Sequence, residues 1–222
     1  MNEHRFTLAG AALWALPSGA LWWPDEALLC VSDLHLGKAG RIARRVGLML
    51  PPWEAEATLD RLATEIDRTA AGTVLCLGDS FDDLAAADSL PEAAANRLTA
   101  LMAGRRWVWI LGNHDPGPVD LGGSHLAEAR IGPLTFRHEA LRQPEADMAG
   151  EVSGHYHPKL SLPGAGPARP CFLYDSRRLI LPAFGTYTGG MSARDPTVAT
   201  LFRPPARAIL TGRRCLLAPL PL

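Results

Sequence analysis

Three short apolar stretches constrain the fold of this chain most strongly, because each ends abruptly in polar residues. They cover residues 27–32, 73–77 and 107–111, the length of a strand rather than of a helix. Uninterrupted apolar strands are typical of sheets that are covered on both faces. Helical patterns lie between them: apolar residues recur at helical spacing over 53–69, and 91–103 begins with a proline and is followed by a glycine. This alternation predicts an α/β fold with parallel strands.

The segments outside this core have β patterns. We expect two short strands, around 12–16 and 20–23, joined by the turn Pro17-Ser18-Gly19. The turn, together with an acidic residue and a single arginine in the leading segment, favours strands over a signal peptide. After Arg130, short apolar segments follow one another with few helical patterns, which predicts a second, largely β layer. The length of 222 residues fits a single domain over 1–222.

Charge and cysteine usage narrow the classes of function. The formal net charge of −1 gives no global basic surface for nucleic acid, so an anionic substrate would need a local patch or a metal. No apolar run has the length of a membrane span. No CxxC spacing links the four cysteines, which are Cys30, Cys76, Cys171 and Cys215. We therefore expect free, buried thiols and a reducing, cytoplasmic location.

Each of the three apolar stretches ends in side chains that can bind metal ions. Their side chains are carboxylates, imidazoles and one amide. The three clusters are Asp33-Leu34-His35, Gly78-Asp79-Ser80-Phe81-Asp82 and Gly112-Asn113-His114-Asp115. A fourth cluster, Gly154-His155-Tyr156-His157, and the single His138 follow other predicted strands. Such donors suit Mn²⁺, Fe or Zn²⁺, whereas a structural zinc would favour thiolates. In an extended segment residues i and i+2 point the same way, so Asp33 and His35 can meet at one ion. His155 and His157 can share one ion or divide between two.

Each cluster alone also has a structural explanation. An Asp-x-His or GNHD segment can form a turn, and GHxH can be a surface loop. His125 is an alternative to His138, although it lacks the strand end found at His138, and His4 is expected at the surface. Four clusters in this order, each after an apolar strand, are difficult to explain as independent turns. They favour one shared site at the carboxyl ends of the strands.

The order of these motifs resembles the calcineurin-like metallophosphoesterase family, in which DxH, GDxxD, GNH(D/E), a lone His and GHxH follow one another. All five elements are present between residues 33 and 157. The resemblance implies a four-layer α/β/β/α sandwich of two mixed sheets with two divalent metal ions. It assigns to the first ion Asp33, His35, Asp79 and His157, and to the second Asp79, Asn113, His138 and His155.

Two such ions can clamp a phosphoryl group and acidify water near neutral pH. His114 then has the position of a general acid that protonates the leaving oxygen. We expect Asp82 to hold His114 protonated, as a carboxylate holds an imidazole in a catalytic triad. The alternative for Asp82 is a turn or a helix cap, a role for which Asp83 is an equal candidate.

A basic run follows the first motif, on a short predicted helix. It contains Lys38, Arg41, Arg44 and Arg45. Lys38 and Arg41 lie nearest the metal loop and are the candidates for binding phosphates beside the scissile bond. The alternative is a solvated helix face, which is the usual explanation of a charge run.

A finer resemblance concerns the DNA-ligase-associated branch of the family. It rests on "SGALWWP", "DLHLGKA", "GLMLPP", "LGNHDP" and "LPAFGTYTGG". It implies a Mn²⁺-dependent phosphodiesterase and single-strand DNA endonuclease with a functional link to DNA ligase and helicase repair proteins. The glycines of "FGTYTGG" could bring backbone close to the site, or form a plain turn.

Two other functions compete with this one. A hydrolase of small phosphates, such as a nucleotide pyrophosphatase, a cyclic-nucleotide phosphodiesterase or a phosphomonoesterase, would use the same metal site. A lipid-linked sugar nucleotide hydrolase should carry a membrane-facing insert, which the sequence lacks. A binding scaffold without catalysis should have lost metal ligands, whereas here every ligand position is filled.

Overall fold

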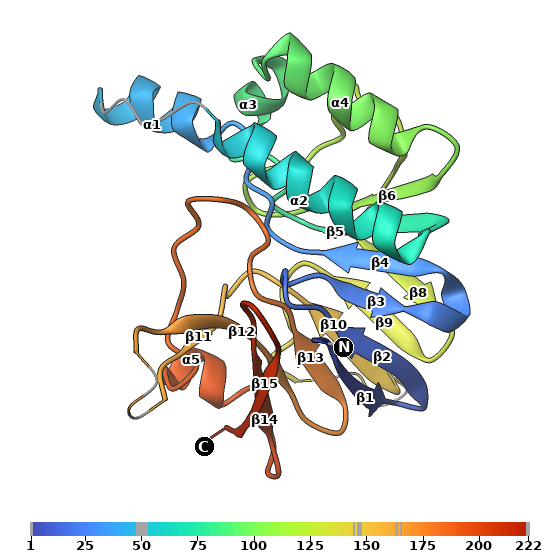
Figure 1. Ribbon diagram of the computed structural model, residues 1–222, viewed down its shortest axis with the longest axis vertical. Helices are drawn as coiled ribbons and strands as arrows, with labels where there is room; N and C mark the ends of the chain where they lie inside the picture. The colour runs from blue at the N-terminus through green and yellow to red at the C-terminus, as the bar shows by residue number, and fades with distance from the viewer. Residues whose placement is uncertain are drawn as a thin grey trace.

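Two mixed β-sheets packed face to face form the centre of the protein (Figure 1). The computed structural model describes residues 2–47, 53–143, 145, 148–162, 164 and 166–220. Seven strands follow one another in the first sheet in chain order: β1 (His4–Leu8), β2 (Ala11–Ala15), β3 (Leu21–Trp23), β4 (Leu28–Val31), β5 (Thr73–Leu77), β6 (Arg106–Ile110) and β7 (Ser124–Leu126). Strands β1 to β4 pair antiparallel and β4 to β7 parallel. The predicted strands of the core and of the N-terminal segment are confirmed.

The second sheet comes from the second half of the chain, as predicted. Its order is β15 (Leu216–Pro219), β14 (Arg207–Leu210), β12 (Arg169–Tyr174), β13 (Arg178–Ile180), β10 (Gly150–Ser153), β9 (Leu134–Arg137) and β8 (Glu128–Ile131), and β11 (Lys159–Leu160) pairs with β12. Strands β9, β10 and β13 are parallel to one another, and the other pairs are antiparallel. The carboxyl ends of β9 and β10 therefore point toward the same edge of this sheet.

The outer face of the first sheet is covered by helices α2 (Glu54–Thr69), α3 (Leu84–Asp88) and α4 (Glu92–Met102). Helix α1 (Lys38–Val46) projects beyond the sheet and contacts α3 (Figure 1). The 3-10 helix η1 (Pro24–Glu26) precedes β4. Both long helices were predicted from the sequence. Helix α3 was not, although Asp83 caps it by accepting from the Ala86 N–H at 2.7 Å. Residues 48–52, which hold most of "GLMLPP", lie outside the described residues.

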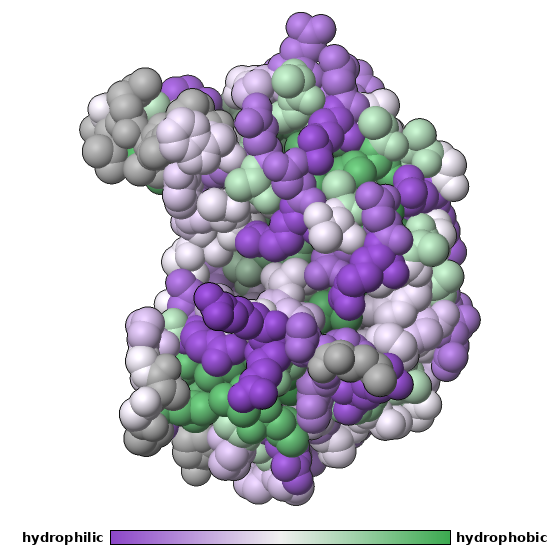
Figure 2. Space-filling model, viewed as in Figure 1, coloured by the Kyte–Doolittle hydropathy of each residue, from purple (hydrophilic) through white to green (hydrophobic). Residues whose placement is uncertain are grey.

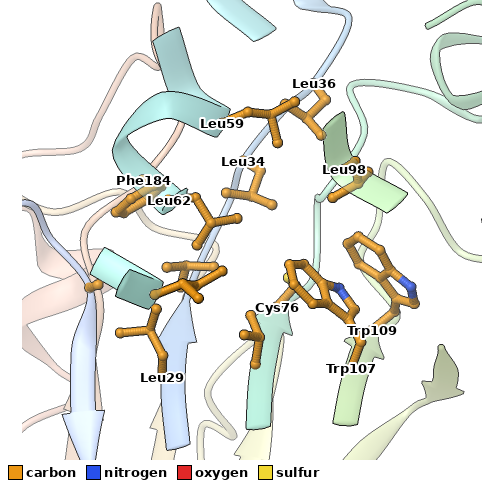
Figure 3. Close-up of a cluster of buried hydrophobic side chains, with 14 of the residues drawn as sticks. Leu29, Leu34, Leu36, Leu59, Leu62, Cys76, Leu98, Trp107, Trp109 and Phe184 are labelled. Atoms are coloured by element: carbon orange, nitrogen blue, oxygen red, sulfur yellow. The ribbon is translucent and has the colours of Figure 1, made fainter. Parts of the chain in front are cut away.

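The core explains the uninterrupted apolar strands. Along β4, β5 and β6, alternate side chains face the helices, as Leu29, Cys76 and Trp109 do (Figure 3). The side chains between them face the second sheet, as Leu75 and Val108 do. Fully burying such a side chain stabilises the fold by roughly 1.5–3 kcal/mol. After the first residues of β5 and β6, Thr73 and Arg106, these strands are thus apolar until they leave the sandwich, and polar residues follow at their ends.

The outer face of the second sheet carries a third apolar cluster, on which the short helix α5 (Pro196–Ala199) packs through Val198. The predicted four-layer sandwich is therefore present, with its last helical layer reduced to α5 among the described residues. All four cysteines are free, as predicted, and Cys30, Cys76 and Cys171 are buried, whereas Cys215 is only partly buried. In the described part of the chain, no helix has both the length and the apolar character needed to cross a membrane.

Candidate metal centre

The segments that follow β4 and β5 continue to pair after the strands end. The His35 N–H donates to the Asp79 carbonyl at 2.9 Å, and the Leu36 N–H donates to Ser80 at 2.9 Å. The Asp82 N–H then donates to the Leu36 carbonyl at 3.1 Å. This pairing of two loops brings the first two motifs side by side at the edge of the sheet.

The residues of the motifs adopt strained backbone conformations. Among the described residues, nine non-glycine residues have positive φ, and five of them are Asp33 (53°), His35 (45°), Asp79 (45°), His155 (68°) and His157 (45°). This left-handed region is disfavoured for residues with a Cβ, and such strain clusters at functional sites. The expectation that Asp33 and His35 converge along an extended segment is wrong in its geometry. They converge because each is turned inward by a left-handed backbone.

Glycines precede the ligands of three motifs, at Gly78, Gly112 and Gly154, because there is no space for a side chain. Gly78 has φ of +69°, and a Cβ on it would overlap the imidazole of His138. A Cβ on Gly154 would overlap the hydroxyl of Ser32 and approach Asp33. The glycines therefore allow loops from the two sheets to meet in close contact.

Asp33, His35 and His157 form the first group of candidate ligands. Their ligand atoms lie within 4.8 Å of one another. His157 Nε2 is 3.2 Å from Asp33 Oδ1 and 3.4 Å from His35 Nε2. The second oxygen of Asp33 accepts from the His155 N–H at 3.1 Å, so the carboxylate is fixed by the loop that carries both histidines.

Asp79, His138 and His155 form the second group, with ligand atoms again within 4.8 Å of one another. His138 Nε2 is 3.5 Å from Asp79 Oδ2 and 3.1 Å from His155 Nδ1. Asn113 Oδ1 lies 2.9 Å from the same His138 nitrogen. Asp79 also lies in a third group with His35 and His114, so it stands between the first two groups.

The donor set fits two divalent cations. Imidazole nitrogens face one another at 3.4 Å (His35 and His157) and 3.1 Å (His138 and His155), an arrangement that a shared cation would favour. The remote nitrogens have other partners: His35 Nδ1 donates to Asp82 Oδ1 at 2.7 Å, and His138 Nδ1 donates to the Leu77 carbonyl at 3.0 Å. Nε2 is therefore the nitrogen that His35 and His138 present to the centre, whereas His155 presents Nδ1.

The electrostatics of the second group also favour positive charge. Burial lowers the pKa of His138, but the hydrogen bond and charge of Asp79 and the charge of Asp33 outweigh it and raise this pKa to about 9. Burial would raise the pKa of Asp79, but His138 brings it well below its usual range. Two buried carboxylates thus stabilise a cationic charge where the histidines meet.

The comparisons with known proteins agree with this site. Residues 27–162 match the model of the family described as calcineurin-like phosphoesterase. The chain belongs to the calcineurin-like phosphoesterase family. Members are metal-dependent hydrolases of phosphoester bonds, and this protein is one of them. Its fold is similar to the crystal structure of the Pseudomonas putida nuclease MPE, with 29% identity, a TM-score of 0.76 and coverage of 99% of this chain and 100% of that chain. No curated protein matches the chain.

Of the two histidines considered for the lone position, the structure places His138, and not His125, among the candidate ligands. His138 follows β9 directly and lies in the second ligand group. His125 lies within β7, where it accepts from the Val119 N–H at 3.2 Å and stacks on Trp109. His4 is half-buried on β1, less exposed than expected.

The carboxylate of Asp82 does not contact His114, contrary to the sequence prediction. It binds His35 Nδ1, accepts from Arg41 Nε and lies 3.7 Å from Lys38 Nζ. His114 Nδ1 instead donates to the backbone carbonyl of Asp82 at 2.8 Å. The reason is the loop pairing, which turns the Asp82 side chain toward His35. Burial would raise the pKa of Asp82, but hydrogen bonds from His35 and Arg41 lower it to about 2.

Lys38 and Arg41 therefore lie at the edge of the centre and share one carboxylate. Their side chains are 16% and 18% exposed, so each keeps a small accessible part. Arg44, by contrast, pairs with Asp83 at 3.2 Å on the exposed side of α1. A cavity of about 540 Å³ opens on the other side of the centre, over His155 and His157. A substrate can thus reach the ligand groups between α1 and the second sheet.

Asp115 is a functional candidate that sequence reasoning missed. Its two buried oxygens accept from four backbone N–H groups, those of Asp79 (3.0 Å), Ser80 (2.7 Å), Phe81 (3.2 Å) and Gly112 (3.0 Å). Burial raises the pKa of Asp115 to about 6, and the charge of Asp79 adds to this effect. The carboxylate fixes the loop on which Asp79 stands. Its place in "GNHD" is the sequence signal, but its partners lie in another loop.

Asp115→Asn is expected to lower the free energy of unfolding by about 2–3 kcal/mol. Each carboxylate oxygen accepts from two N–H groups, so the amide NH₂ of asparagine would face two donors in either orientation. Urea unfolding followed by circular dichroism measures the change. Asp83→Asn is the matched control, because asparagine caps a helix as well as aspartate does. Equal stability of wild type and Asp115→Asn would contradict this role.

Proposed function

We propose that the protein is a Mn²⁺-dependent phosphodiesterase that cleaves single-stranded DNA internally, with a role in DNA repair beside DNA ligase and helicase proteins. The observation that supports the phosphodiesterase assignment is the pair of ligand groups, Asp33/His35/His157 and Asp79/His138/His155, with Asp79 also close to His35 of the first group. Similarity to a nuclease over 99% of this chain supports nucleic acid as the substrate. The free thiols support a reducing, cytoplasmic location.

The residues of the centre have separable tasks in this proposal. Asp33, His35 and His157 would hold one ion, and Asn113, His138 and His155 the other, with Asp79 between them. When bound, the ions supply Lewis acidity toward the phosphoryl oxygens and lower the pKa of water. His114 is partly exposed, with its Nδ1 fixed, and can donate a proton from Nε2 to the leaving oxygen.

The surroundings suit a strand rather than a duplex. The molecule is concave between α1 and the part that contains α5 and β11 (Figure 2). The cavity over His155 and His157 is also lined by Gly190 and Met191, from the segment between β13 and α5. Lys38 and Arg41 supply a local positive charge at this concavity, although the net charge is −1. A few cations at the centre can position one phosphate backbone, whereas tight duplex binding uses a wider basic surface.

Circular single-stranded DNA tests the proposal, because a circle offers no end to an exonuclease. We expect nicking when Mn²⁺ is added to chelator-treated protein and none before it. A parallel panel contains small phosphomonoesters and phosphodiesters. An intact circle with turnover of the small esters would contradict the nuclease assignment and favour a small-molecule phosphoesterase with the same centre.

A further inference from the structure

The segment between β13 and α5 exposes an aromatic side chain beside the metal centre. Tyr187 is 40% exposed, and Trp53 is the other exposed large aromatic residue in the described part of the chain. No hydrogen bond from the Tyr187 hydroxyl to another described residue is present, so the hydroxyl has no partner that would keep the side chain from a ligand. A tyrosine with this exposure offers a flat apolar face to a ligand.

Both ends of this loop contact the segments that carry the ligands. At one end the Phe184 N–H donates to Ser32 at 2.7 Å, and the Gly185 N–H donates to the Asp33 carbonyl at 3.0 Å. At the other end, Gly190 lies so close to the His157 carbonyl that a Cβ would overlap it. Tyr187 therefore stands on a short loop between the Asp33 and His157 segments.

The neighbours of Tyr187 hold the loop rigidly. The Thr186 N–H donates to Thr58 Oγ1 of α2 at 3.0 Å, and Thr188 Oγ1 donates to the Gly185 carbonyl at 3.0 Å. Figure 1 shows the loop rising from β13 toward α1 and the beginning of α2. The loop thus borders the concavity in which a strand would reach the centre.

The backbone of Tyr187 is strained in the same way as the ligands. Its φ is 62°, and among the described residues the other non-glycine residues with positive φ outside the metal centre are Ala9, Ala27 and Ala70. A bulky residue in this conformation costs of order 1 kcal/mol or more and persists where the surroundings fix it. Surroundings that keep Tyr187 in this conformation fix its backbone, and with it the position from which the side chain extends.

We propose that Tyr187 is a stacking platform for a nucleobase next to the scissile phosphate. This inference rests on the proposed nucleic-acid substrate and adds a binding residue to it. Every base has a π face, so stacking on a tyrosine would hold a single strand without reading its sequence. Bases in a duplex are already stacked on their neighbours, so the platform also selects single strands.

Tyr187→Ala tests the platform because it removes the ring and keeps a Cβ residue at the left-handed position. We expect a fluorescent oligonucleotide of about 12 nucleotides to bind roughly 5- to 150-fold more weakly, measured by fluorescence anisotropy in the presence of chelator. KM for single-strand cleavage should rise by a similar factor. Turnover of a small phosphodiester should not change, because it has no base to stack.

Three controls separate stacking from other effects. Tyr187→Phe should bind like wild type, since the hydroxyl has no part in stacking. Leu216→Ala should also bind like wild type, because this residue is 39% exposed but lies on the edge strand β15. An oligonucleotide of abasic residues should bind wild type and Tyr187→Ala equally, because it has lost the partner of the ring.

The outcomes distinguish the two proposals. If wild type nicks the DNA circle but Tyr187→Ala binds and cleaves single strands normally, the platform is wrong and the nuclease function stands. If Tyr187→Phe binds the oligonucleotide as weakly as Tyr187→Ala, the hydroxyl rather than the ring accounts for binding, and the stacking proposal is wrong. If wild type turns over only small esters and binds no oligonucleotide, the nuclease function itself fails and the platform with it.

Discussion

Replacing Asp79 by alanine should lower phosphodiester hydrolysis by at least about a thousandfold, because metal ions supply several kcal/mol of charge stabilisation in the transition state. The Asp79 carboxylate lies within 4.8 Å of the ligand atoms of His35 and His114 on one side and of those of His138 and His155 on the other. Its loss therefore removes the donor that stands between the two ligand groups. Initial rates with a small diester at saturating Mn²⁺ measure the effect without depending on DNA binding.

Folding and metal content must be followed in the same variant. Asp79 is buried, but its side chain contacts the ligand groups rather than the apolar core, so we expect a circular dichroism spectrum like that of wild type. The number of bound ions per chain should fall. Asp88→Ala is the control, since it changes an exposed aspartate at the end of α3. Full activity of Asp79→Ala would show that the assignment of a shared ligand is wrong.

The sequence predicts those elements whose own residues show a long hydrophobic run or a clear hydrophobic periodicity. Strands β4, β5 and β6 are buried on both faces, so their apolar runs are uninterrupted. Strand β1 was missed, because it pairs only with β2 at the edge of the sheet and alternates exposed with half-buried residues. Helix α3 was missed because five residues are too few to show helical periodicity.

Some features of the site could likewise be predicted from the sequence, and others could not. The residue types at the strand ends identify the candidate ligands, because the carboxyl ends of parallel strands meet at one edge. The partners of Asp82 and Asp115 could not be predicted, because they depend on hydrogen bonds between loops far apart in the chain. Asp82 contacts His35, 47 residues away, and Asp115 binds the backbone of Asp79, 36 residues away. Sequence spacing carries no information about such pairing.

His114 is compatible with two roles. Its Nδ1 donates to the Asp82 carbonyl at 2.8 Å, which leaves Nε2 directed toward the centre, 4.0 Å from Asp79 Oδ2. With His35 and Asp79 it could be a ligand, because their atoms lie within 4.8 Å of one another. As a general acid it would protonate the leaving oxygen instead. Its side chain is 30% exposed, more than those of His35 (3%) and His138 (8%), and this exposure toward substrate favours the acid.

The two roles predict different losses of activity in His114→Ala for substrates with different leaving groups. As an acid, His114 contributes about 10²–10⁴-fold to the departure of a DNA alkoxide, which must be protonated. A nitrophenolate leaves without a proton, so His114→Ala should lose DNA cleavage by this factor and keep most of its hydrolysis of a nitrophenyl diester. Its metal content should equal that of wild type and of His125→Ala, a control outside the centre. If both substrates lose activity equally and an ion is lost, His114 is a ligand, and the proton for the leaving oxygen must come from another group.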